Sequence, residues 1–149
     1  MTAADIQNIE ISWKTNTLAS CKLFNEGILE DALSGYKTAF QLAESLNNNM
    51  AECIKKDIPF IQVYVISCNN IAHTYVAMGL KDQAESMFRQ VLRYLLNLRK
   101  QPDISIVELL NELKRATIEY VSFIEANNGN KKNLEDLFQI LKTRKFPIN

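Results

Sequence analysis

The chain has 149 residues, of which 47% are hydrophobic and 23% charged, and its 17 basic and 17 acidic residues cancel at neutral pH. This length and composition are typical of one soluble globular domain, and a balanced charge argues against a general nucleic-acid or anionic-membrane binder. No stretch approaches the roughly 20 apolar residues of a membrane span, and Met1 to Lys14 lacks the apolar core of a signal peptide, so we expect a cytoplasmic protein.

The first predicted helix spans about residues 5–25, and the second begins near Glu30. Apolar residues recur in both at three- and four-residue intervals, as on one face of an amphipathic helix. In the second helix this phase continues through Asn47-Asn48-Asn49, although asparagine is a weak helix former. We therefore predict one long helix that reaches about Lys56; the alternative is a stop at Leu46 followed by a loop.

The next helix is expected to start at Asp57 and Pro59, because proline suits a first helical turn. The run Ile58 to Ile66 reads IPFIQVYVI, and by itself it also fits a buried strand. No second strand candidate can pair with it, and the run leads unbroken into a helical stretch, so we predict a helix. This helix is apolar nearly all round and should be the central, most buried one.

The stretch Cys68 to Tyr94 carries two amphipathic faces separated by Gly79, where a helix end requires a residue that tolerates positive φ. Two helices joined by about four residues must fold back on each other. Pro102 and Asp103 then signal a fifth helix. A turn at 127–130 precedes the last one, from Lys131 to about Thr143.

The helical hairpin predicted at Cys68 to Tyr94 resembles the tetratricopeptide repeat (TPR). The TPR pattern is W-x2-L-G-x2-Y in the first helix and A-x3-F in the second. The matching residues are Cys68, Ile71, Ala72, Tyr75, Ala84 and Phe88. The frame recurs around Gly27 with Asn16, Ala19, Ser20, Leu23, Ala32 and Tyr36, and in degenerate form around Gly129 with Ile118, Val121, Ser122, Glu125, Leu134 and Phe138. The anchors Ala32, Ala84 and Leu134 stand 52 and 50 residues apart (84 − 32 and 134 − 84), which exceeds the ordinary repeat.

The resemblance implies an all-α fold: a right-handed array of antiparallel helical hairpins, or TPR-like α-α superhelix, of about six lengthened helices. It covers nearly the whole chain, so we predict a single domain over residues 1–149. Another antiparallel helical array is the alternative.

The sequence offers no phosphate-binding loop, HExxH motif or nucleophile elbow. We therefore expect no enzyme, no catalytic residue and no cofactor. Cys21, Cys53 and Cys68 are isolated among apolar neighbours and the only histidine is His73, so we expect buried reduced thiols and no metal site. The single tryptophan, Trp13, is expected to pack at an end of the stack. The basic residues Arg89, Arg93, Arg99 and Lys100 are interpreted as a solvated face, with a docking patch for an acidic partner as the alternative.

In TPR-like stacks the first helix of each hairpin lines a concave groove that holds a peptide or helix. Carried onto this chain by the aligned frame, the resemblance implies these partner-binding residues: Leu18, Cys21, Phe24, Asn69, Asn70, His73, Tyr120 and Phe123. The amides suit a peptide backbone and the aromatic rings suit apolar anchors. The leading hypothesis is a non-enzymatic adaptor or small chaperone that binds a protein or peptide. The alternative is a structural protein that forms a homodimer through an end face of the stack, with Trp13 and Ile9, or Phe138 and Leu141.

Overall fold

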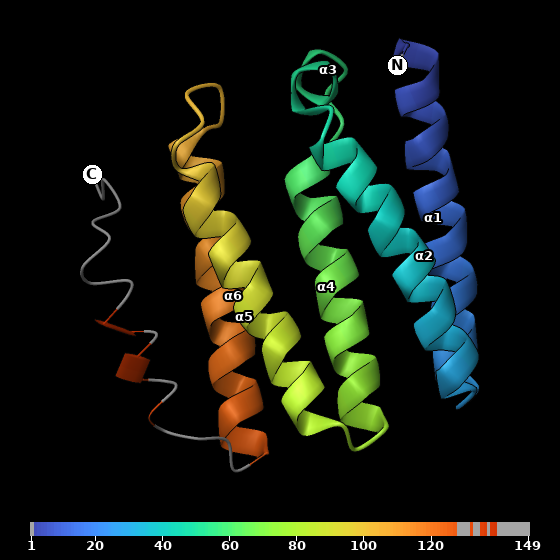
Figure 1. Ribbon diagram of the computed structural model, residues 1–149, viewed down its shortest axis with the longest axis vertical. Helices are drawn as coiled ribbons and strands as arrows, with labels where there is room; N and C mark the ends of the chain where they lie inside the picture. Colours follow the sequence, from blue (N-terminus) through green and yellow to red (C-terminus); the bar gives the residue numbers. More distant parts are fainter. Residues whose placement is uncertain (1, 128–131, 133–134, 137, 140–149) are drawn as a thin grey trace. The chain divides into compact units, whose positions relative to one another are not determined.

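In the computed structural model of the protein, which describes residues 2–127, 132, 135–136 and 138–139, every regular element is an α helix (Figure 1). The helices are α1 (Ala3–Asn25), α2 (Leu29–Asn47), α3 (Met50–Lys55), α4 (Phe60–Ala77), α5 (Lys81–Leu98) and α6 (Ile106–Ala126). The predicted all-α array is confirmed, and the IPFIQVYVI run is helical.

The chain divides into two compact units, residues 1–87 and 88–149, and the boundary falls inside α5. The first unit contains α1 to α4 and the first turns of α5. The second contains the rest of α5 and α6. A single domain over the whole chain stays a prediction.

A capping box starts α1. Thr2 accepts a hydrogen bond from the Asp5 amide at 3.2 Å, and the Thr2 amide donates to the Asp5 carboxylate at 2.9 Å. These bonds satisfy amides that have no partner within the helix. The bonds from the Thr2 backbone and side chain also lower the pKa of the Asp5 carboxyl.

Three helices of the first unit end in the same way, each with a residue at positive φ. Gly27 ends α1 at φ 80°, Gly79 ends α4 at φ 78°, and Asp57 ends α3 at φ 52°. In each case the amide of the following residue donates to a carbonyl five residues back, at 2.9 Å, as in a Schellman motif. The expected glycine turns are confirmed at Gly27 and Gly79, while Gly129 lies outside the described residues.

The prediction of one long second helix is wrong, because α2 ends at Asn47 and α3 is a separate helix. The side-chain amide of Asn49 donates to the Ser45 carbonyl at 2.8 Å, and its backbone amide donates to the Leu46 carbonyl. Asparagine thus competes for backbone groups that a continuous helix would use. The break buries Cys53, whose thiol contacts the Leu46 carbonyl at 3.3 Å.

The predicted start of α4 is confirmed at Pro59, the N-cap residue directly before Phe60. Asp57 belongs to the end of α3 and not to this start. By contrast, α6 does not begin at Pro102 and Asp103. Ser105 caps it instead by accepting a hydrogen bond from the Glu108 amide at 3.3 Å.

The helices α1 and α2 pack closely against each other as a hairpin. Gly35 of α2 lies so near Ser20 of α1 that a Cβ on the glycine would collide with the serine side chain. Ala32 and Tyr36 continue this contact and join Ile71 of α4 in one buried cluster. A small residue in the middle of α2 therefore lets the two backbones approach.

As predicted, α4 is largely buried: ten of its 18 residues are inside the protein. Trp13 of α1 donates from Nε1 to the Ser67 hydroxyl at 2.7 Å, and Phe40 of α2 packs edge-on against Tyr64 at 5.3 Å. Trp13 is thus buried against α4, which removes it from the set of residues expected at a free end face.

In the second unit, Phe88 of α5 packs against Phe123 of α6 with ring centroids 5.1 Å apart. The repeat frame fails in α6, since Ile118, placed at the tryptophan position, is 66% exposed, and Ser122 is exposed as well. The buried face of α6 instead contains Leu113, Ala116, Tyr120, Phe123 and Ile124. At the packed aromatic position Phe138 is 51% exposed, while Leu134 and the bounds of the last predicted helix lie outside the described residues.

Candidate interaction surface

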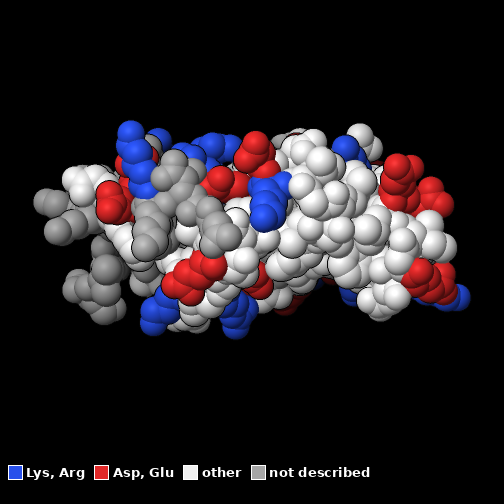
Figure 2. Space-filling model, turned by 90° about the horizontal axis from the view of Figure 1, so that it is seen from below, with Lys and Arg blue, Asp and Glu red and all other residues white. Residues whose placement is uncertain are grey.

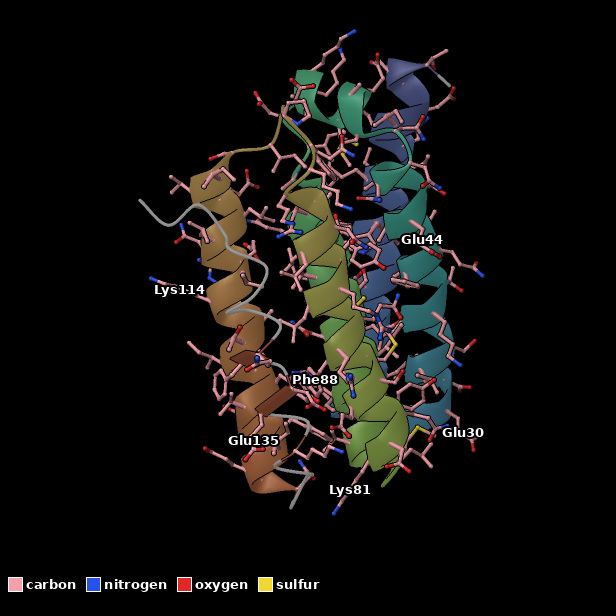
Figure 3. All side chains as sticks on the ribbon, turned by 60° about the vertical axis from the view of Figure 1, so that its left-hand side comes forward. Glu30, Glu44, Lys81, Phe88, Lys114 and Glu135 are labelled. Carbon is pink, nitrogen blue, oxygen red and sulfur yellow. The ribbon has the colours of Figure 1, made fainter. Side chains whose placement is uncertain are left out.

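Exposed aliphatic side chains are unevenly shared among the long helices. In the described part of the chain, α2 and α5 expose no large hydrophobic residue. By contrast, α1, α4 and α6 together expose Ile11, Leu18, Ile66, Val107 and Ile118. Figure 3 shows the contrasting face of α2, from which the labelled Glu30 and Glu44 point outward.

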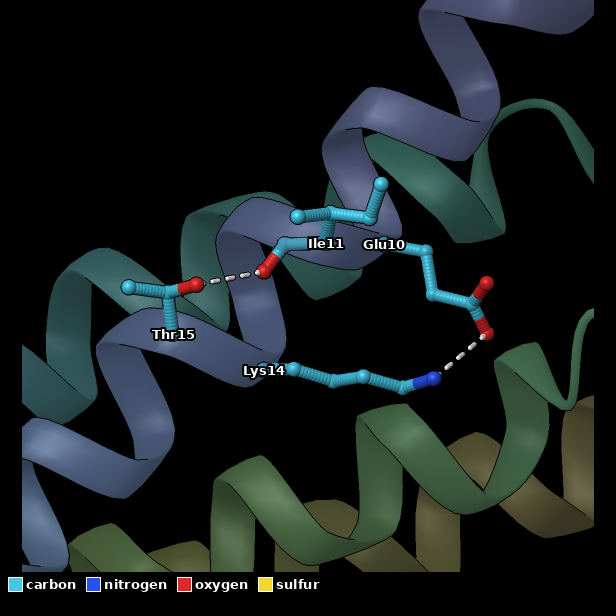
Figure 4. Close-up of polar contacts among 4 residues, drawn as sticks. All are labelled: Glu10, Ile11, Lys14 and Thr15. Carbon is cyan, nitrogen blue, oxygen red and sulfur yellow. Dashed lines mark hydrogen bonds and ion pairs between the residues drawn. The ribbon is translucent and has the colours of Figure 1, made fainter.

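On α1 the exposed aliphatic residues stand two helical turns apart. Leu18 is 71% exposed and Ile11 is 59% exposed, and a spacing of seven residues places them on one face. Lys14 and Thr15 lie between them (Figure 4). The Lys14 ammonium is 3.9 Å from the Glu10 carboxylate, and the Thr15 hydroxyl donates to the Ile11 carbonyl at 3.0 Å.

On α4 one face carries Gln62, Ile66, Asn69 and His73, which are spaced by four, three and four residues. Ile66 is 42% exposed, Gln62 and His73 are exposed, and Asn69 and Asn70 are half-buried. Within the described residues, the side-chain amides of Asn69 and Asn70 make no hydrogen bond and can therefore bond to a partner. The predicted α4 residues thus do share an accessible surface.

Cys21 and Phe24 are placed differently from Leu18. Both are half-buried against the cluster around Tyr36, and the Tyr36 hydroxyl donates to the Cys21 sulfur at 3.1 Å. Burial, followed by this contact with Cys21, raises the pKa of Tyr36 above its ordinary value. These two residues therefore support the α1–α2 packing and offer a partner only part of their surface.

Tyr120 and Phe123 do not line an accessible surface. They are only 1% and 7% exposed, because α6 turns the opposite face outward from the one that the repeat frame indicates. The expectation that they receive partner side chains is corrected accordingly. Ile118 and Val107 occupy the exposed face in their place, and their aliphatic character is the signal that sequence reasoning overlooked.

The thiols are free, and two of them are buried. Burial, then the charges of Glu10 and Glu52, raises the pKa of Cys53 to about 11. Burial, then the charge of Glu44, raises that of Cys68 to about 12. Both thiols are therefore protonated at neutral pH and buried in the core. Because the thiolate is the nucleophilic form, neither is a candidate nucleophile. No group of three or more potential metal ligands occurs among the described residues.

One end of the first unit carries a group of acidic residues. Glu26, Glu30 and Asp31 surround the α1–α2 turn, and Figure 2, seen from below, shows acidic side chains on the side where α1 and α2 lie. A shallow depression between the two helices is lined by Asp5, Asn8, Ile9, Ser12 and Leu42. None of these features brings an acid, a base and a nucleophile together in the arrangement that catalysis requires.

A protein-family model described as "Protein of unknown function (DUF2753)" matches residues 11–144. No curated protein and no solved structure matches the chain. Over the described residues, no helix is both long and apolar enough to cross a membrane.

Proposed function

The chain belongs to the DUF2753 family of proteins of unknown function, and from the surface above we propose that it is a non-enzymatic protein–protein interaction module. In the first unit it binds a peptide or helix with the exposed faces of α1 and α4, as an adaptor or small chaperone. We also propose, as the sequence suggests, that the chain is a TPR-like helical array and that it is located in the cytoplasm.

The observation that supports it is the distribution of exposed aliphatic residues. A helix that serves only as an outer layer has a polar outer face, as α2 does with Glu30 and Glu44. On α1, however, Leu18 is the most exposed of the large hydrophobic residues described. On α4, the residues four positions before and after Ile66 are Gln62 and Asn70, and neither is charged. Such residues on otherwise regular helices mark a surface that another molecule covers.

The polar part of the surface fits the same function. Asn69 and Asn70 supply amide donors and acceptors that are without a partner in the described part of the chain. An aliphatic anchor beside free amides is the usual composition of a specific binding surface, because the anchor contributes affinity and the amides fix orientation.

Site-specific photo-crosslinking in cells tests the proposal. A photoreactive amino acid at Leu18 or His73 should capture the same partner, while the same amino acid at Glu44 on α2 should capture none. Capture from Glu44 with equal yield, or from no position, would exclude α1 and α4 as the binding surface.

Titration of the captured partner against two variants measures the contribution of the amides. We expect Asn70→Ala to weaken binding by about 1–3 kcal/mol, since a partner group loses its hydrogen bond. Arg93→Ala on α5 should change only a salt-sensitive association rate. If Arg93→Ala abolishes binding and Asn70→Ala leaves it unchanged, the basic residues of α5 form the site.

A further inference from the structure

We propose, building on this function, that the outer face of α1 binds an amphipathic helix of the partner that carries acidic residues beside its aliphatic stripe. The face is defined by Ile11, Lys14, Thr15, Leu18 and Lys22. Three properties of this face select this ligand: its hydrogen bonds, the spacing of its aliphatic residues and its charges.

The hydrogen bonds favour a helical partner over an extended one. An extended peptide exposes backbone amides and carbonyls that need partners when they are buried. Between Ile11 and Leu18 the polar groups are already engaged, since the Thr15 hydroxyl bonds to the Ile11 carbonyl and Lys14 pairs with Glu10 (Figure 4). A helix satisfies its own backbone groups and can lie on such a surface without loss.

The spacing of the aliphatic residues also fits a helix. Ile11 and Leu18 are seven residues apart, which is about 10.5 Å along the helix axis. Residues i and i+7 of a partner helix span the same distance. A helix packed nearly parallel to α1 can therefore match both side chains at once.

The charges indicate an acidic partner. This face carries Lys14 and Lys22. The adjoining Glu10 is paired with Lys14, and Glu26 follows one turn beyond Lys22 at the α1–α2 turn. Lys22 is exposed one turn beyond Leu18, and within the described residues it forms no ion pair. Glutamate or aspartate flanking the partner's aliphatic stripe would complement Lys22, while Lys14 stays paired with Glu10.

A second copy of the chain fits the face less well. An antiparallel pairing that matches Ile11 with Leu18 of the partner copy has its two-fold axis between positions 14 and 15. It would bring the two Lys14 ammonium groups near that axis, where like charges repel. No carboxylate of this face would then meet Lys22.

The test uses three synthetic 18-residue peptides with one leucine stripe at helical spacing. The first has glutamate flanks, the second has lysine flanks, and the third is the glutamate peptide with a central proline. Fluorescence anisotropy against the full-length protein should show the glutamate peptide binding at least about tenfold more tightly than either of the others. Equal affinity for the three peptides, or no binding of the glutamate peptide, would overturn the proposal.

Protein variants locate the binding. Lys22→Glu should weaken binding of the glutamate peptide and strengthen binding of the lysine peptide. Leu18→Ser should weaken binding of both peptides. Lys81→Glu, an exposed lysine at the start of α5 labelled in Figure 3, is the matched control and should change neither. Preference for glutamate that survives Lys22→Glu and Leu18→Ser would place the peptide elsewhere and contradict the assignment.

The outcome is separable from that of the proposed function. If Leu18 and His73 crosslink to a partner but the protein shows no preference for the glutamate peptide, the proposed interaction function stands. The inference that the ligand is an acidic helix is then wrong. Sedimentation that shows a dimer in the wild type and a monomer for Leu18→Ser would assign this face to a second copy and overturn the inference.

Discussion

The repeat frame behaves differently in α4 and in α6, although it was read from the same kind of apolar spacing. In α4 its anchors Cys68 and Ala72 are fully buried. In α6 the corresponding Ile118 and Ser122 are exposed. The α4 frame was tied to the glycine turn at Gly79 and to Ala84 beyond it. The α6 frame depended on residues of which Gly129 and Leu134 lie outside the described part.

The difference shows what an apolar pattern can and cannot fix. α6 has aliphatic residues on both faces, with Leu113 and Ala116 inside and Val107 and Ile118 outside. Periodicity identifies such a segment as a helix, but it cannot decide which of two apolar faces is buried. A small residue at a close contact is the additional information that decides it.

The largest expected effect breaks the close contact of the α1–α2 hairpin. Gly35→Leu should lower the free energy of unfolding by about 3 kcal/mol, because even a Cβ at this position meets Ser20. Gln41→Leu, on the exposed side of α2, is the control and should change it by less than about 0.5 kcal/mol. Urea unfolding measures both, and equal losses would mean that helix spacing does not depend on Gly35.

Alkaline pH tests burial in the first unit, which contains all three cysteines. In the folded protein the pKa of Cys53 is about 11 and that of Cys68 is about 12, whereas the ordinary pKa of a thiol is 9.0. The unfolded chain therefore loses thiol protons first. Stability should be fully present below pH 9 and should fall above it by about 1.4 kcal/mol per pH unit for each thiol.

Two variants assign this loss of stability. Cys68→Ala should remove the contribution of its thiol and flatten the decline between pH 9 and 11, as followed by urea unfolding at each pH. Ile118→Ala, the counterpart in α6, should retain the full decline. A slope unaffected by Cys68→Ala would show that other groups govern alkaline unfolding.

Ala84→Leu tests the close packing expected at a small, buried residue of α5. Ala84 is fully buried, so the added carbons should cost about 1–3 kcal/mol. Ala126→Leu, at the exposed end of α6, should matter less. Thermal unfolding compares the two variants, and equal melting temperatures would place the close contact elsewhere.

The smallest expected effect compares two helix ends with the same geometry. Asp57 has positive φ like Gly79 but bears a Cβ, which strains the backbone. Asp57→Gly should therefore raise the free energy of unfolding by about 0.5–1 kcal/mol, and Gly79→Ala should lower it by about 1 kcal/mol. A destabilised Asp57→Gly variant would mean that the aspartate side chain contributes more than the strain costs.

The candidate surface was only partly predictable. Leu18 and His73 lie on exposed faces of α1 and α4. Cys21 contacts Tyr36, and Tyr120 is buried. The sequence cannot show such placements, since they depend on how residues distant along the chain pack against each helix.

By itself the sequence determined the helical class, the burial of α4 and the turns at Gly27 and Gly79, because these follow from local periodicity and backbone freedom. Only the tertiary structure decided that α2 stops at Asn47, that Asp57 adopts a glycine-like conformation and that α6 buries Tyr120 rather than Ile118. In each of these cases two local conformations or two faces are close in free energy. Contacts with distant residues then select one of them.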